Sequence, residues 1–177
     1  MRLVESILKR NPCYAAGKKI EVTGLMLHSV GCPQPDASVF IKSWNDPSHG
    51  NSCVHGFIDG NDGTVYQTLP WDHRGWHCGS GPKGSGNNSY IGVEMCEPAC
   101  VKYTSGANFT CSDSDAAKAV VRRTYEAAVE LFAMLCKKFD FRIRKATTEE
   151  SLQITEIRNI SGRSSEPGTR WRVSAKR

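Results

Sequence analysis

A single histidine, His28, closes an apolar segment that begins at Val22, and its imidazole could act as a metal ligand or as a base. A ligand needs partners, because a catalytic zinc ion takes three protein ligands and keeps a fourth position for water. The chain has 5 histidines, and none of them follows His77. It also has 8 cysteines but no CxxC pair, which argues against a zinc ribbon. The partners of His28 are therefore not evident from histidine and cysteine spacing.

The elements that would position His28 follow an α/β pattern up to about residue 140. The apolar run 22–28 predicts a buried strand, residues 36–44 a short helix, and residues 89–96 a further strand. Two β-like segments flank the turn sequence GNDG at 60–63 and predict a hairpin. These segments predict a domain in which strands and helices alternate.

The clearest predicted helix covers residues 116–138. Ser112 or Ser114 could cap its N-terminus, and Lys137 and Lys138 suit its C-terminal end. Its predicted buried face consists of Ala117, Val121, Tyr125, Ala128, Leu131 and Leu135. Residues 141–177 have neither a sustained period nor much apolar content, so we expect a domain over 1–140 and a poorly ordered tail over 141–177.

Four pieces of sequence occur in a fixed order: a strand-end His followed by Ser, then VHGFIDGNDGTVYQTLP, then GWHCG, then NNSYIGVEMCEP. This ordered set, within residues 22–138, resembles the zinc-dependent N-acetylmuramoyl-L-alanine amidases of the type-2 family. Phage lysins and peptidoglycan recognition proteins belong to the same family. The resemblance implies an α/β fold with a mixed β-sheet flanked by helices, and a groove that binds glycan and stem peptide over a zinc ion. It also implies hydrolysis of the amide bond between N-acetylmuramic acid and L-alanine.

The resemblance assigns roles to four residues. His28 matches the first zinc ligand, and Glu94 matches a catalytic carboxylate that serves as general base. His77 matches a histidine of a loop at the substrate groove. His55, which we also expect at the substrate, lies beside the place where some members carry a catalytic tyrosine; that place is Val54 here. A mechanism assisted by tyrosine is therefore not expected.

The other two zinc ligands of the family follow the long helix, in stretches like SHKEG and NHGDPEHLW, and neither stretch is present. The codons of residues 153–162 can also be read in a shifted frame, in which the third base of each codon is joined to the first two bases of the next. In that frame they permit the sequence Asn, His, Gly, Asp, Pro, Glu, His, Leu, Trp. Similar matches run collinearly along most of the tail, including Ser, His, Lys, Glu, Gly from FRIRKA. We infer that residues 141–177 are an out-of-frame amidase C-terminus, joined near residues 139–141. Zinc binding should then be weak, because most of the coordination energy is missing.

The formal net charge of +5 is unevenly distributed. Residues 141–177 hold nine Lys and Arg against four Asp and Glu, which is +5, so residues 1–140 are neutral. The charge of the domain therefore gives no reason to expect nucleic acid as a partner, and the resemblance implies peptidoglycan. The N-terminal segment LVESIL is interrupted by Glu5 and followed by Lys9 and Arg10, so we expect neither a signal peptide nor a membrane segment. These features favour a prophage-type endolysin made in the cytoplasm that acts on the wall after release.

Three functional hypotheses remain open. The first is an amidase by descent whose activity is lost or low in the chain as written. The second is a non-catalytic peptidoglycan-binding module. The third is a thiol hydrolase that pairs one of the 8 cysteines with His28, His55 or His77, for which the sequence has no local signature. The sequence does not indicate an oligomeric state.

Overall fold

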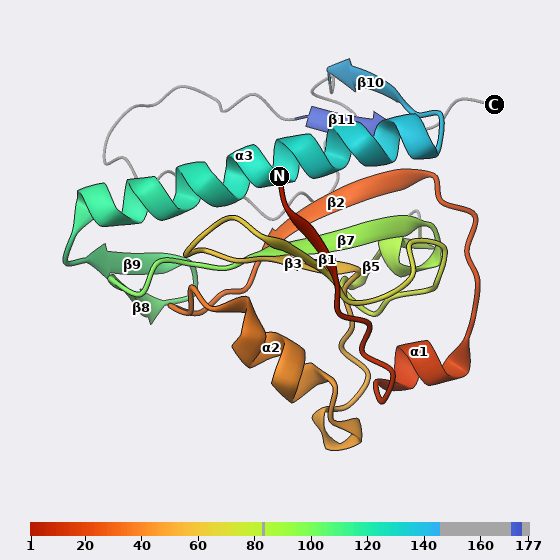
Figure 1. Cartoon of the computed structure of the whole chain (residues 1–177), viewed down its shortest axis with the longest axis horizontal. Helices are drawn as coiled ribbons and strands as arrows, with labels where there is room; N and C mark the ends of the chain where they lie inside the picture. Colours follow the sequence, from red (N-terminus) through yellow and green to blue (C-terminus); the bar gives the residue numbers. More distant parts are fainter. Residues whose placement is uncertain (83, 146–170, 175–177) are drawn as a thin grey trace.

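A seven-stranded mixed sheet is the centre of the computed structural model, which describes residues 1–82, 84–145 and 171–174 (Figure 1). Its strand order is β1-β4-β3-β7-β2-β11-β10. The strands are β1 (Leu3–Glu5), β2 (Gly24–Ser29), β3 (Gly56–Ile58), β4 (Val65–Gln67), β7 (Tyr90–Met95), β10 (Arg142–Lys145) and β11 (Trp171–Ser174). The expected mixed sheet flanked by helices is confirmed.

The three inner strands β3, β7 and β2 run parallel to one another, whereas β4 is antiparallel to β3 and β11 is antiparallel to β2. The predicted strands over 22–28 and 89–96 are β2 and β7, and the hairpin around 60–63 is β3–β4. Successive side chains of a strand point to opposite faces of the sheet. In β7, Ile91 and Val93 therefore pack on one face, while Gly92 and Glu94 belong to the other.

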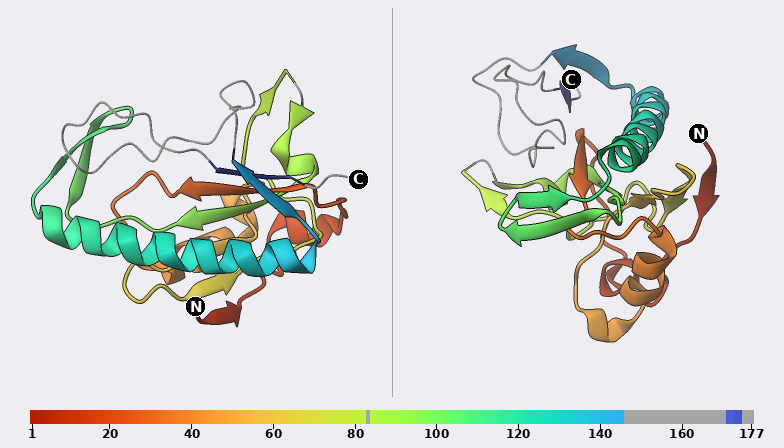
Figure 2. Two further views of the ribbon diagram at one scale, coloured as in Figure 1. Left: turned by 90° about the horizontal axis from the view of Figure 1, so that it is seen from above. Right: turned by 90° about the vertical axis from the view of Figure 1, so that its left-hand side faces the viewer.

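Helix α3 (Ser114–Lys138) covers the face of the sheet that Ile91 and Val93 line (Figure 2). The cap is Asp113, between the two serines predicted, and its side chain accepts a hydrogen bond of 2.9 Å from the Ala116 N–H. A carboxylate also suits the positive end of the helix better than a hydroxyl does. The buried residues are Ala117, Thr124, Ala127, Ala128, Leu131, Leu135 and Cys136. Tyr125 was predicted on this face but is 43% exposed, because the contact stripe passes through Thr124 and Ala128.

Helix α2 (Ala37–Trp44) lies on the opposite face of the sheet (Figure 2). It is the helix predicted over 36–44, and the side chain of Asp36 caps it by accepting from the Ser38 N–H. A second, smaller core forms between this helix and β3, where Phe57 stacks on Phe40 and meets the edge of Trp44. The sheet is thus covered by helices on both faces, and α2 adjoins the face that carries Glu94.

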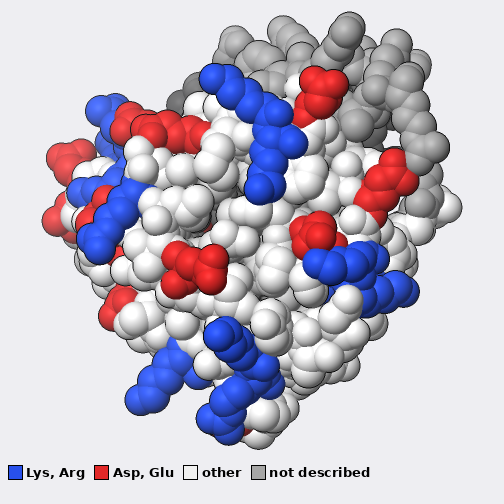
Figure 3. All heavy atoms as spheres, turned by 45° about the vertical axis from the view of Figure 1, so that its right-hand side comes forward, with Lys and Arg blue, Asp and Glu red and all other residues white. Residues whose placement is uncertain are grey.

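The remaining elements are short and surround this centre. They are α1 (Pro12–Ala16), η1 (Pro47–His49), η2 (Gly86–Asn88) and the small hairpins β5 (Ser80–Gly81) with β6 (Gly84–Ser85) and β8 (Val101–Ser105) with β9 (Asn108–Cys111). None of the described helices is both long and apolar enough to cross a bilayer. Basic and acidic side chains alternate over the face drawn in Figure 3.

The predicted tail begins at a residue that belongs to the core, since Phe141 is buried and packs in the cluster under α3. Beyond it, β10 and β11 pair with each other, and β11 reaches β2 through Ser174 and Gly24. Residues 146–170 and 175–177 lie outside the described residues. The out-of-frame origin of 141–177 and the boundary at 140 therefore stay predictions.

Candidate functional site

The parallel pairing of β2 with β7 places His28 directly opposite Glu94 in register. Phe57 of β3 lies opposite Glu94 on the other side. Leu27 and Val93 pack toward α3, so His28 and Glu94, one residue further along each strand, belong to the opposite face. Two residues 66 positions apart in the sequence thus become neighbours through strand register.

Glu94 is a largely buried carboxyl group without full hydrogen-bond satisfaction. Its Oε2 atom is buried and has no partner among the described residues. Burial raises the pKa of Glu94 to about 8, and the nearby Glu97 carboxylate adds to the rise. Glu97 itself is fixed by hydrogen bonds from Ser29 Oγ, the Gly31 N–H and Tyr103 Oη. A carboxyl group in this state can hold a proton at neutral pH and still exchange it.

His28 and His77 form a direct imidazole pair, with Nε2 of His28 3.1 Å from Nδ1 of His77. His77 Nε2 lies 3.2 Å from the Tyr90 carbonyl oxygen, which can only accept, so in the neutral ring this nitrogen carries the proton. His77 Nδ1 is then an acceptor, and His28 Nε2 donates to it. Burial lowers the pKa of both rings to about 4, so both are neutral at pH 7. The lone pair of His28 Nδ1 is left for another partner.

Gly92 makes room for the His77 ring above β7. A Cβ atom at position 92 would lie 2.4 Å from Cγ and 2.5 Å from Nδ1 of His77, closer than carbon and nitrogen atoms can approach without a shift. The imidazole therefore rests on bare backbone. Any larger residue at this position would displace it from His28.

Asn87 fixes the loop that carries His77. It is 3% exposed, its Oδ1 accepts from the N–H groups of His77 (2.7 Å) and Cys78 (3.1 Å), and its Nδ2 donates to the Cys78 carbonyl (2.8 Å). The Asn87 amide thus supplies the hydrogen bonds that a neighbouring strand would supply to the backbone of a regular element. Sequence reasoning did not identify Asn87 or Gly92 as site residues, although both lie in the quoted stretch NNSYIG.

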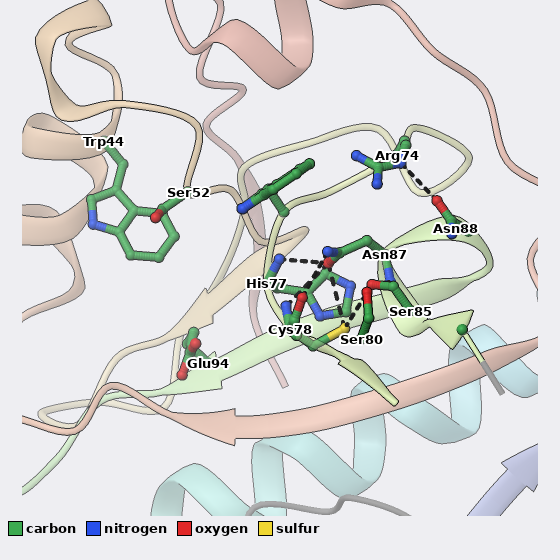
Figure 4. Close-up of a pocket in the computed structure, with 13 residues that line it drawn as sticks. Trp44, Ser52, Arg74, His77, Cys78, Ser80, Ser85, Asn87, Asn88 and Glu94 are labelled. Atoms are coloured by element: carbon green, nitrogen blue, oxygen red, sulfur yellow. Dashed lines mark hydrogen bonds between the residues drawn. The ribbon is translucent and has the colours of Figure 1, made fainter. Parts of the chain in front are cut away.

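A polar pocket of about 670 Å³ opens on this face, and Glu94 and His77 line it (Figure 4). Arg74, Asn87 and Asn88 contribute to its wall, together with the loop residues from Cys78 onward. Trp44, from the C-terminal end of α2, lies across the pocket from Arg74. The volume suits a ligand of several sugar or amino-acid units.

His55 is separate from this pocket. It is fully buried, its Nε2 lies 2.8 Å from the His73 carbonyl oxygen, and its Nδ1 accepts from the Gly92 N–H at 3.1 Å. Both ring nitrogens are thus used by backbone groups, which gives His55 a structural role. The predicted contact of His55 with substrate stays a prediction.

The donor set does not fit a catalytic zinc ion. Within the described residues, no group of three or more His, Cys, Asp or Glu side chains could hold a metal. His77 spends its Nδ1 on His28, and no histidine or cysteine follows Cys136 in the whole sequence. The single hydrogen bond of the His28 ring uses Nε2, so its Nδ1 stays available, and the role of His28 as a zinc ligand stays a prediction. No hydrogen bond joins a cysteine to His28, His55 or His77 in the described part of the chain, so the thiol-hydrolase hypothesis gains no support.

The mixed sheet flanked by helices is also the fold of two solved structures, those of PlyL and of the PlyG catalytic domain. PlyL superposes with a TM-score of 0.53 at 17% identity, over 79% of this chain and 76% of that one. The PlyG catalytic domain gives 0.52 at 18% identity, over 79% and 73%. These likenesses define the fold class.

The family model described as N-acetylmuramoyl-L-alanine amidase matches residues 18–169, and the chain belongs to this family, whose members are generally zinc-dependent. Two amidases of Bacillus subtilis (strain 168) are similar to it over 64 residues: CwlH at 42% identity and XlyA at 51%. Each match covers 36% of this chain, and it spans 24% of CwlH and 20% of XlyA. The matched family span crosses the boundary that we predict at residue 140.

Proposed function

We propose that this chain is a peptidoglycan hydrolase domain that acts on the amide bond between N-acetylmuramic acid and L-alanine, with Glu94 as its acid–base group. The observation that carries the proposal is the buried Glu94 carboxyl, whose Oε2 lacks a partner at the wall of a polar pocket. With a pKa of about 8, Glu94 holds its proton at neutral pH and can donate it to the leaving amine. As a carboxylate, it can accept a proton from an attacking water.

His77 lines the pocket together with Glu94, and His28 adjoins it through the hydrogen bond between the two rings. Both rings are neutral at pH 7, so they add no positive charge that would hold Glu94 in its ionised form. The His28 ring is oriented by its hydrogen bond to His77 and presents Nδ1. The imidazole pair thus leaves one ring nitrogen of His28 unbonded, on the strand that pairs with the strand of Glu94.

Zinc, when bound in members of this family, supplies an activated water and polarises the scissile carbonyl. In the chain as written, His28 would be the single ligand of the predicted set. Each missing ligand removes part of the coordination energy, so we expect substoichiometric zinc and a low turnover. Hydrolysis then depends on the Glu94 carboxyl and on the positioning of the substrate in the pocket.

The test is the release of new L-alanine amino groups from purified peptidoglycan, detected by amine labelling and mass spectrometry. We expect slow release by the wild-type chain and release at background by Glu94→Gln, which keeps the shape of a protonated carboxyl but cannot exchange a proton. Glu126→Gln, a change on α3 away from the pocket, is the matched control and should behave as wild type. Equal release by the wild type and Glu94→Gln would contradict the proposal.

A second candidate is a non-catalytic peptidoglycan-binding module, which the shortage of metal donors favours. Co-sedimentation with purified walls separates the two. A binding module sediments with peptidoglycan and leaves its amide bonds intact over long incubation. An amidase domain both sediments and releases L-alanine amino groups.

The proposed place of action is the bacterial wall, reached after release from the cell, as expected for an endolysin encoded by a prophage. The proposed partner is peptidoglycan, and not a nucleic acid.

A further inference from the structure

Arg74 is the one cation among the described residues that line the pocket. Figure 4 shows it on the opposite side of the pocket from Glu94, with His77 between them. Arg74 and Glu94 thus mark two separate ends of the pocket, and the end at Arg74 carries a positive charge.

The guanidinium of Arg74 is held in a fixed plane by two contacts. Its Nε donates a hydrogen bond of 2.9 Å to Asn88 Oδ1, and its Cζ lies 4.9 Å from the ring centroid of Trp76. Trp76 is 49% exposed, so the stacked pair stands at the mouth of the pocket and not in the core. A cation over an indole face is stabilised without losing its outward hydrogen-bond donors.

The two Nη groups of Arg74 are left without partners. Within the described part of the chain, no ion pair involves Arg74, and the single hydrogen bond of its side chain uses Nε. A planar guanidinium with two parallel N–H groups matches a carboxylate in a bidentate arrangement. The arrangement is that of a prepared anion site that no acidic residue of the described chain fills.

We propose that Arg74, supported by Asn88 and Trp76, binds a free carboxylate of the stem peptide and makes the pocket selective for stem peptides in which that carboxylate is not amidated. The inference rests on the proposed function, since it places the muramyl–alanine amide at Glu94 and the following acidic residue at Arg74. In a stem peptide, the second residue is a glutamate linked through its γ-carboxyl. Its α-carboxyl is therefore either a free acid or a carboxamide.

The experiment compares two synthetic ligands that differ only in that group: N-acetylmuramoyl-L-alanyl-D-isoglutamate and N-acetylmuramoyl-L-alanyl-D-isoglutamine. Calorimetric binding is measured for the wild type, for Arg74→Gln, and for Arg122→Gln, an exposed arginine on α3 that serves as the matched control. Circular dichroism verifies that each variant is folded, and mass spectrometry verifies that the ligands are intact after titration.

We expect the wild type and Arg122→Gln to bind the acid at least about 10-fold more tightly than the amide, a difference typical of one charged hydrogen-bonded contact. Arg74→Gln should bind both ligands equally, close to the wild-type affinity for the amide. A preference that survives in Arg74→Gln would overturn the inference. Equal wild-type binding of both ligands would overturn it and leave the proposed function standing, whereas no binding of either would count against both.

A third probe separates a carboxylate site from a general anion site. Inorganic phosphate at millimolar concentration should compete with the acid ligand much more weakly than acetyl-D-isoglutamate does. Competition by phosphate at equal or lower concentration would show that the Arg74 site prefers phosphate groups, such as those of wall polymers. That result would overturn the assignment to the stem peptide.

Discussion

Replacing Gly92 by alanine tests whether the His77 ring rests on bare backbone. The added Cβ would lie 2.4 Å from His77 Cγ and 2.7 Å from Cδ2, so either the ring or strand β7 must move. Overpacking of this kind costs about 1–3 kcal/mol. For a chain of this size, such a loss lowers the melting temperature by roughly 2–4 °C per kcal/mol, or about 2–12 °C in total. The matched control is Gly79→Ala, because a Cβ at position 79 meets nothing within 4 Å.

The assays are thermal unfolding and urea unfolding, combined with NMR of the imidazole nitrogens to follow the hydrogen bond from His28 to His77. We expect Gly92→Ala to be destabilised and to lose that bond, and Gly79→Ala to behave as wild type. Because the clash needs the ring, His77→Ala should abolish most of the additional cost of Gly92→Ala in a double-mutant cycle. If Gly92→Ala matches Gly79→Ala in stability and keeps the imidazole pair, the described packing of His77 is wrong.

Three further results are expected. Stability should peak near pH 6.5. The folded pKa of about 4 for His28 and His77 lies below the unfolded value, so stability falls as the pH drops from about 6.5 to 4, whereas the raised pKa of Glu94 makes stability fall as the pH rises toward 8. Urea midpoints measured from pH 4 to 9 should show both limbs, and Glu94→Gln should flatten the alkaline limb. Leu131→Ala should cost about 2–5 kcal/mol because this side chain is fully buried between α3 and the sheet, whereas Val129→Ala, at a position that is 52% exposed, should cost under about 0.5 kcal/mol. Equal losses in chemical denaturation would refute the described helix face. Elemental analysis after dialysis should find well under one zinc per chain. Rebuilding the tail in the alternate frame should bring zinc to one per chain, whereas a full complement in the chain as written would show that its donors are sufficient.

The sequence was sufficient for the main sheet and the long helix because their patterns are local. The apolar runs ending at His28 and containing Ile91 predict strands, and the period of Ala117, Ala128 and Leu131 predicts the helix that covers them. The cap was missed by one residue, since serine and aspartate both suit that position. The exposure of Tyr125 could not be predicted, because helix period alone does not fix how far the buried stripe extends.

The candidate site could be predicted only in part, since its geometry depends on contacts between distant segments. Family resemblance pointed to His28, His77 and Glu94, and the structure brings these three together. The loop that carries His77 folds back over β7, where His77 occupies the space above Gly92 and Asn87 makes four polar contacts. No local period of the sequence predicts this arrangement of the loop. The hairpin β8–β9 was also not predicted, although Gly106, at φ +53° in its turn, is a residue type that such turns favour.

The most direct test of the central claim is the count of new L-alanine amino groups in purified peptidoglycan after prolonged incubation with the wild type and with Glu94→Gln. Both proteins should sediment with the walls, because the substitution leaves the volume of the pocket unchanged. We predict that amino groups accumulate slowly with the wild type and stay at background with Glu94→Gln. Accumulation at the same rate with both proteins, or none with either, would contradict the assignment of Glu94 as the acid–base group of an amidase site.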